Sequence, residues 1–345
     1  MSRRLTWPPW STRSWAATGE ATTSDPRGIV GPVVLIGLMA AMPGMKSGAG
    51  MGMGSSSSTW HALLVAWPIG PWSAFALTLE VLAGWWYVRS VRRLATRGRH
   101  WSSRRTLAFL SGLIALGVAL ESPVATLTGT SFVFHIYQHL LVMLIAPPLL
   151  ALGGPMTLAL QSSSRPAKRR LLWALRSWPA RVASFPVLVA AIYYGSMFVF
   201  FLTPLLGIAM RHMALMDAVN VHFLIIGYLF WWSIIGLEPT PHWRMPYPLR
   251  ILALFMGVPF ESFLGIAIMT TSRPLAPMYS LSSGHTGGGV LWVGAELLTV
   301  IPLLVVGVQW SRAEERKAAR DDRRLDALRT EQRVAESAGS VAASG

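Results

Sequence analysis

The sequence pattern with the clearest chemistry is a regular row of two histidines and a methionine, His135, His139 and Met143. Four residues of α-helix rise ~6 Å and return to nearly the same face, so these side chains would form a ladder of two nitrogen donors and one thioether. Neutral imidazole and thioether groups suit copper far better than magnesium or calcium. The ladder is therefore a candidate copper site. The alternative is that the histidines cap the helix or contact lipid headgroups.

The segment that carries the ladder, residues 135–155, is apolar enough to lie in a bilayer. Ionisable side chains are costly there and usually functional. Two consecutive prolines at 147–148 predict a kink below the ladder, and the Gly-Gly-Pro run at 153–155 predicts the end of the helix.

Two other apolar segments carry polar side chains that could complete the site. His222 lies about two turns into the first of them, and we expect it to face the helix of His135 and His139. The alternative for His222 is a hydrogen-bonded packing role. Glu261 follows Pro259 in the next segment, where a charged carboxylate costs ~2.5–3.5 kcal/mol. We expect Glu261 to be a hard metal ligand, a proton carrier, or a neutral acid bonded to a neighbouring helix.

Further soft donors lie on the segments between the apolar ones. Flexible glycines allow several thioethers to converge on one ion, which is a way to bind Cu(I) without cysteine. The candidate capture residues are Met45, Met51, Met53, His61, His212, Met213 and Asp217. Met210 lies in the same loop as His212. The alternative is that the N-terminal methionines belong to a hydrophobic run and a low-complexity linker.

The composition is typical of a polytopic membrane protein. Of 345 residues, 52% are hydrophobic and 13% are charged, and the mean hydropathy is +0.46. The net charge of +15 comes from short basic clusters between apolar segments. Such clusters orient membrane proteins and contact anionic lipid, so we expect a lipid bilayer and no nucleic acid as partner. The absence of cysteine excludes disulfides, thiolate metal sites and thiol catalysis.

Changes in composition divide the chain into five segments. A basic segment, 1–27, which we expect to be disordered, precedes an apolar segment, 28–45, which is either a signal-type sequence or an anchor. A Met/Gly/Ser-rich extracytoplasmic linker, 46–67, leads to the membrane core, 68–310. A charged cytoplasmic tail, 311–345, follows.

Seven apolar segments in the core predict an all-α fold, a polytopic transmembrane helical bundle with seven core spans and an optional N-terminal signal anchor. The spans are expected near 68–88, 106–120, 132–152, 183–203, 215–237, 249–270 and 290–310. Basic residues concentrate in alternate loops. The positive-inside rule then predicts a multi-pass plasma-membrane protein whose C-terminus is cytoplasmic. This topology gathers most histidines at the extracytoplasmic side.

Three stretches resemble the successive signatures of the polytopic CtaG family of cytochrome c oxidase assembly proteins. They read HIYQHLLVMLIAPPLLALGGP, HFLIIGYLFWWSIIGLEPTP and YPLRILALFMGVPFESFLGIAIM, and the resemblance covers about residues 68–310. It implies an integral-membrane factor that handles copper for maturation of the oxidase, with oxidase subunits or a copper chaperone as partners. His135, His139 and His222 match motif positions directly.

Two further functions remain open from the residues alone. A copper transport or resistance protein would need soft ligands that continue through the bilayer. A haem-binding redox protein would pair His222 with His135 or His139. We predict no enzymatic activity, because no nucleophile with a suitably placed acid and base and no Gly-rich phosphate loop is present.

Overall fold

The computed structural model describes residues 67–68, 70–236 and 245–344, with side chains described up to residue 330. All described residues belong to one compact unit, Met42–Gly345. The predicted segments 1–27 and 28–45 and almost all of the linker lie outside the described residues. The same holds for four of the capture candidates, Met45, Met51, Met53 and His61.

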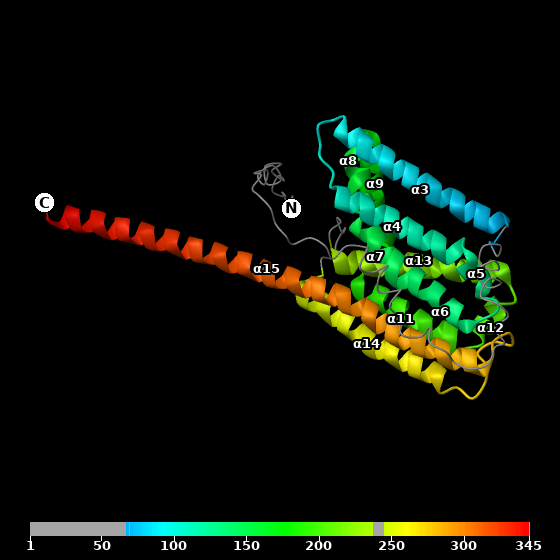
Figure 1. The fold of residues 1–345 in the computed structure, drawn as a ribbon. Coiled ribbons are helices and arrows are strands. Elements are labelled where there is room, and N and C mark those ends of the chain that lie inside the picture. The colour runs from blue at the N-terminus through cyan, green and yellow to red at the C-terminus, as the bar shows by residue number, and fades with distance from the viewer. Residues whose placement is uncertain (1–66, 69, 237–244, 345) are drawn as a thin grey trace, which may run out of the picture. The chain divides into compact units, whose positions relative to one another are not determined.

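Every regular element in the described part is a helix, which confirms the all-α prediction (Figure 1). In chain order these elements are α3 (Pro71–Ala95), α4 (Ser103–Leu120), α5 (Pro123–Leu127), α6 (Phe132–Leu140), the π-helical turn η2 (Leu141–Ile145), α7 (Ala146–Leu152), α8 (Pro155–Ser162), α9 (Arg165–Leu175), α10 (Trp178–Ala183), α11 (Pro186–Leu202), α12 (Leu205–Ala209), α13 (Met213–Ile235), α14 (Tyr247–Met269) and α15 (Leu281–Ser344).

The continuous rod made by α6, η2 and α7 lies at the centre of the helical bundle. It contacts α4, α13 and α15, while α3 packs on α4 and α8, and α14 packs on α11 and α15 (Figure 1). In the most apolar 18-residue stretch of this central span 72% is buried inside the protein, whereas the corresponding share is 33–39% in the other four candidate spans. The segment that carries the histidine ladder is therefore surrounded by protein.

Five helices in the described part are long and apolar enough to cross a membrane, so the chain is a multi-pass membrane protein. They are Ser103–Leu127, Phe132–Ser162, Met213–Ile235, Tyr247–Met269 and Leu281–Thr330. The sequence predicted seven spans. Of the remaining two, α11 is apolar but has only 17 residues, less than the ~20 that a bilayer requires. The other, α3, has 25 residues but includes tryptophans, Glu80 and several arginines.

The π-helical turn follows from the two consecutive prolines. Pro147 and Pro148 have no N–H, so the carbonyls of Met143 and Leu144 lack the donor that an α-helix would provide. Trp231 of α13 donates its indole N–H to the Met143 carbonyl at 2.9 Å. Because backbone polar groups within a bilayer must be satisfied inside the protein, this bond ties the π-helical turn to α13.

The predicted Gly-Gly-Pro end of the central helix is confirmed. The helix α7 ends at Leu152, and Gly154 adopts a left-handed conformation with φ of 65°. That conformation favours glycine because a side chain would clash with the backbone. Pro155 then occupies the first position of α8, where its missing N–H does no harm.

Replacing Trp231 by phenylalanine is expected to lower the free energy of unfolding by about 1–3 kcal/mol, because the buried Met143 carbonyl loses its donor. Adding Pro147→Ala restores a backbone N–H four residues after Met143 and should recover part of this loss. Thermal denaturation of the single and double variants in detergent measures both effects. Trp232→Phe is the matched control, since the Trp232 indole N–H is buried without a partner. Equal losses for the two tryptophan variants would contradict this account.

Facing glycines allow α14 and α15 to approach closely. A Cβ atom at Gly265 would lie 2.9 Å from the carbonyl oxygen of Gly288, and a Cβ atom at Gly288 would lie 2.8 Å from that of Gly265. Small residues at such crossings are typical of helix pairs in membranes. One position earlier on α15, a Cβ atom at Gly287 would clash with Phe132 of α6. The glycines therefore bring the start of α15 against the histidine-bearing helix.

Candidate metal centre

His135 lies in the first turn of α6 and is 1% exposed. Phe132 and Phe200 stack on its ring with centroid distances of 6.0 and 5.8 Å. The hydroxyl of Tyr279, from the segment between α14 and α15, lies 3.4 Å from Nδ1 of His135. Aromatic packing and this contact hold the imidazole in one orientation.

The hydrogen bonds of Tyr279 determine which nitrogen of His135 is free. Burial raises the pKa of Tyr279 above its usual value, so the hydroxyl keeps its single proton. Tyr279 donates this proton to the carbonyl of Thr128 at 2.7 Å. The contact with His135 is then a hydrogen bond when Nδ1–H donates to the Tyr279 oxygen, which leaves the lone pair on Nε2 free to bind a metal ion.

His139 lies one turn further along α6 and is 5% exposed. Its ring meets Phe201 and Phe223 edge to face, at centroid distances of 5.0 and 4.5 Å. Nε2 of His139 is buried and has no hydrogen-bond partner. Leaving such an atom unsatisfied costs about 1–3 kcal/mol, and folded proteins rarely do so without a reason. This nitrogen keeps a free lone pair inside the bundle, next to α6.

Met210, the residue that follows α12, brings a thioether close to Tyr279. Sδ of Met210 lies 3.6 Å from the Tyr279 hydroxyl, which also contacts His135. Tyr279 thus links the imidazole of His135 to the thioether of Met210, while His139 lies one turn further along α6. Sequence reasoning placed Met210 in a loop without selecting it as a site residue, and it did not identify Tyr279. Both join the cluster only through contacts between distant segments.

Two other predicted ligands, His222 and Met143, lie differently from the prediction. His222 is exposed on α13, and its neighbour Phe223 packs against His139 instead. We expected His222 to face α6, but the rotation of α13 turns that side chain away. Met143 is fully buried but lies in η2. The wider π-helical turn breaks the four-residue spacing on which the ladder depended, so only His135 and His139 remain in α-helical register.

The remaining described capture candidates lie at the start of α13. His212 precedes the helix and is exposed, and Met213 is 82% exposed. Asp217 is half-buried one turn later. All three are accessible from outside the bundle, and their role in ion capture stays a prediction.

Glu261 belongs to a separate polar cluster between α14 and α15. It is 3% exposed and accepts a hydrogen bond from the Thr299 hydroxyl at 3.4 Å. The neighbouring Glu296 accepts from Ser262 and, at 2.6 Å, from the indole of Trp292. The contact with Thr299 matches one of the three predicted roles, an acid bonded to a neighbouring helix. The role of Glu261 as a metal ligand stays a prediction.

The donors gathered beside α6 fit a soft ion. Within the part of the chain that the structure describes, no three His, Asp or Glu side chains are arranged to hold a metal ion. The soft donors in this region are His135 and His139 of α6 and, linked to His135 through Tyr279, Met210. Two neutral nitrogens and a thioether suit Cu(I), whereas calcium and magnesium require oxygen ligands.

The sequence model of one protein family, described as cytochrome c oxidase caa3 assembly factor (Caa3_CtaG), matches residues 85–313. The chain belongs to this CtaG family. The match confirms the resemblance carried by the three sequence stretches. It includes α6 with both histidines, and also Met210 and Tyr279.

Uncharacterized proteins of three mycobacteria are similar to this CtaG-family chain. Those of Mycobacterium bovis and Mycobacterium tuberculosis are each 34% identical over 258 residues, which cover 70% of this chain and 39% of the relative. That of Mycobacterium leprae is 33% identical over 264 residues, with coverages of 71% and 40%. The chain thus spans about two fifths of the length of the curated relatives it matches. No solved structure matches it.

Proposed function

We propose that this protein is a membrane-embedded assembly factor that holds Cu(I) for insertion into cytochrome c oxidase. Membership of the CtaG family supports the assembly role. The copper role rests on one observation, the buried Nε2 of His139 that has no hydrogen-bond partner. Oxidase subunits or a copper chaperone would exchange the ion with the site.

The chemistry of the site follows from its three donors and its aromatic wall. His135 and His139 would supply nitrogens and Met210 a thioether, while Tyr279 orients the His135 ring through Nδ1. The phenylalanines around the imidazoles keep water away. The site binds and releases the ion without catalysing a reaction, and neutral ligands favour the monovalent state.

The proposed topology has seven core spans, with α3 and α11 added to the five long apolar helices. By the positive-inside rule, the basic clusters support an orientation with the start of α6 at the extracytoplasmic face of the plasma membrane and the tail of α15 in the cytoplasm. The exposed residues His212 and Met213 and the N-terminal methionines would lie on the same side as the site. They would collect the ion before transfer to α6.

Metal binding by the purified full-length protein tests this proposal. With Cu(I) added, we expect the wild type to bind one ion near α6, and His135→Ala and Met210→Leu to weaken binding by tenfold or more. Cytochrome c oxidase activity in membranes of a complemented deletion strain should fall in parallel. The control is His100→Ala, which removes an exposed histidine between α3 and α4 and should leave copper binding unchanged.

Three outcomes would contradict the proposal. Unchanged copper content in both variants would show that the cluster is only packing. A Soret band in the purified protein would indicate a haem site instead. A deletion strain with altered cellular copper but normal oxidase activity would indicate copper transport.

A further inference from the structure

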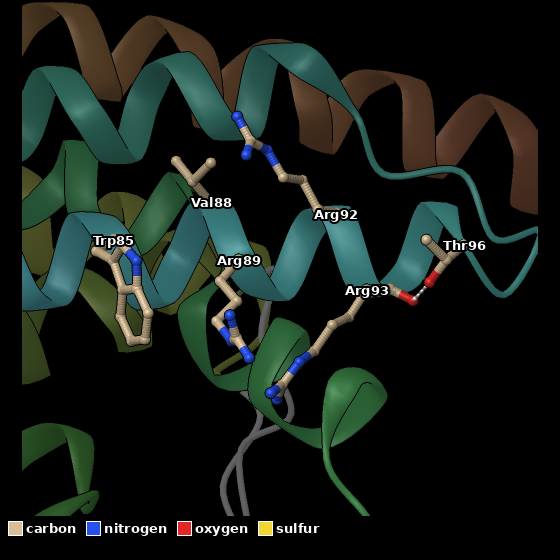
Figure 2. Close-up of a pocket in the computed structure, with 6 residues that line it drawn as sticks. All are labelled: Trp85, Val88, Arg89, Arg92, Arg93 and Thr96. Atoms are coloured by element: carbon tan, nitrogen blue, oxygen red, sulfur yellow. Dashed lines mark hydrogen bonds between the residues drawn. The ribbon is translucent and has the colours of Figure 1, made fainter.

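We propose that a basic groove on α3 binds the phosphate headgroup of an anionic lipid. Figure 2 shows the groove, a hollow of about 320 Å³ on the C-terminal part of this helix. It is lined by Trp85, Val88, Arg89, Arg92, Arg93 and Thr96. The groove is formed by different residues from those of the candidate metal centre.

Two arginines in the groove lie close together, and no acidic residue of the described part of the chain forms an ion pair with them. Arg89 and Arg93 are four residues apart and extend to the same side of α3, whereas Arg92 extends to the opposite side (Figure 2). Like charges at this spacing repel each other. The ion pair found within residues 67–330 joins Arg329 and Asp326 on α15, away from the groove. A phosphate between the two guanidinium groups would relieve the repulsion and accept several of their N–H donors.

The indole of Trp85 completes this side of the groove. The guanidinium carbon of Arg89 lies 5.2 Å from the centroid of the Trp85 ring, a cation–π distance. This contact holds the Arg89 side chain against the indole on this side of α3. The arrangement is thus partly formed before any anion arrives.

The residues that precede the groove indicate that the anion belongs to a lipid. The earlier turns of α3 carry large apolar side chains that are 49–62% exposed, namely Phe75, Leu77, Leu79, Val81 and Leu82. Such a surface suits acyl chains rather than water. Exposed Trp85 and Trp86 follow, where indole rings prefer the membrane interface. The arginines come one turn later, at the level of the headgroups.

Lipid retention by the full-length protein tests the proposal. The protein is purified in mild detergent, exposed to vesicles of phosphatidylcholine and phosphatidylglycerol in equal parts, and analysed by native mass spectrometry for bound lipid. We expect the wild type to retain phosphatidylglycerol selectively, and Arg89→Gln/Arg93→Gln to bind it about tenfold more weakly. Arg89→Lys/Arg93→Lys keeps the charge and should retain part of the binding.

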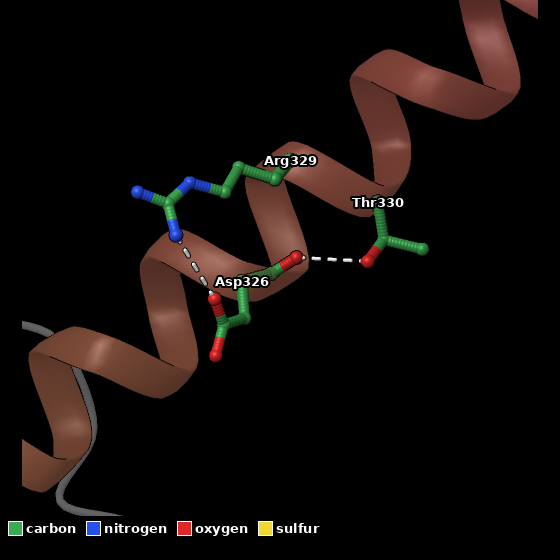
Figure 3. Close-up of polar contacts among 3 residues, drawn as sticks. All are labelled: Asp326, Arg329 and Thr330. Carbon is green, nitrogen blue, oxygen red and sulfur yellow. Dashed lines mark hydrogen bonds and ion pairs between the residues drawn. The ribbon is translucent and has the colours of Figure 1, made fainter.

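A matched control lies on the exposed tail of α15. Arg320→Gln/Arg324→Gln removes the same charge at the same helical spacing, in a region where Arg329 pairs with Asp326 of its own helix (Figure 3). We expect this variant to retain phosphatidylglycerol as the wild type does. Equal retention by the groove variant and the control variant would overturn the proposal. Displacement of the lipid by millimolar inorganic phosphate would also overturn it, because the groove would then be a site for free phosphate.

Discussion

Replacing His139 by leucine is expected to stabilise the protein and to abolish its copper binding. Leucine has a similar volume and removes the buried Nε2 that has no partner, so the free energy of unfolding should rise by about 1 kcal/mol or more. The contacts with Phe201 and Phe223 stay apolar. Thermal denaturation in detergent, copper stoichiometry and oxidase activity in membranes measure the three effects. A gain in stability with a loss of function is typical of a functional site.

His135→Leu provides the contrast, one turn earlier on the same helix. This change leaves the Tyr279 hydroxyl without the Nδ1–H donor of His135, so we expect it to lower stability by about 1 kcal/mol while also removing copper binding. Opposite changes in stability with the same functional loss would show that the loss of copper binding is not a consequence of lower stability. A fall in stability for His139→Leu would mean that its imidazole has a structural partner, and the copper proposal would lose its main support.

Adding a single methyl group at the crossing of α14 and α15 is expected to have the second large effect. The Cβ atom of Gly288→Ala would lie 2.8 Å from the Gly265 carbonyl oxygen and 2.9 Å from side-chain atoms of Ile268 and Met269. The two helices must separate, which should lower the free energy of unfolding by about 1–3 kcal/mol. Because α15 also packs on α6, copper binding should weaken. Thermal denaturation and copper stoichiometry measure these changes.

The matched control is Gly307→Ala on the same helix, where a Cβ atom would meet nothing within 4 Å. Alanine is the better helix former, so this variant should gain up to about 1 kcal/mol. Similar losses for Gly288→Ala and Gly307→Ala would show that the close approach of α14 and α15 does not decide the effect.

The sequence by itself determined the class of the protein and the local course of its helices. Long apolar segments without cysteine indicate an all-helical membrane bundle, because only helices and closed barrels satisfy their backbone within a bilayer. Two local features were also predictable from the sequence. One is the position of His135 and His139 on one face of a helix, and the other is the end of the central helix just before Gly154. Both depend on residues within one or two turns of each other.

The tertiary structure decided which side chains meet. The helix α13 is apolar almost all round, so its sequence does not indicate which face turns inward. Packing against the central rod places Phe223 next to His139 and leaves the neighbouring His222 exposed. The same packing brings the Trp231 indole N–H within hydrogen-bond distance of the Met143 carbonyl. The contact between His135 and Tyr279 joins residues 144 positions apart. No local periodicity contains such information, because the rotation of each helix is set by the neighbours against which it packs.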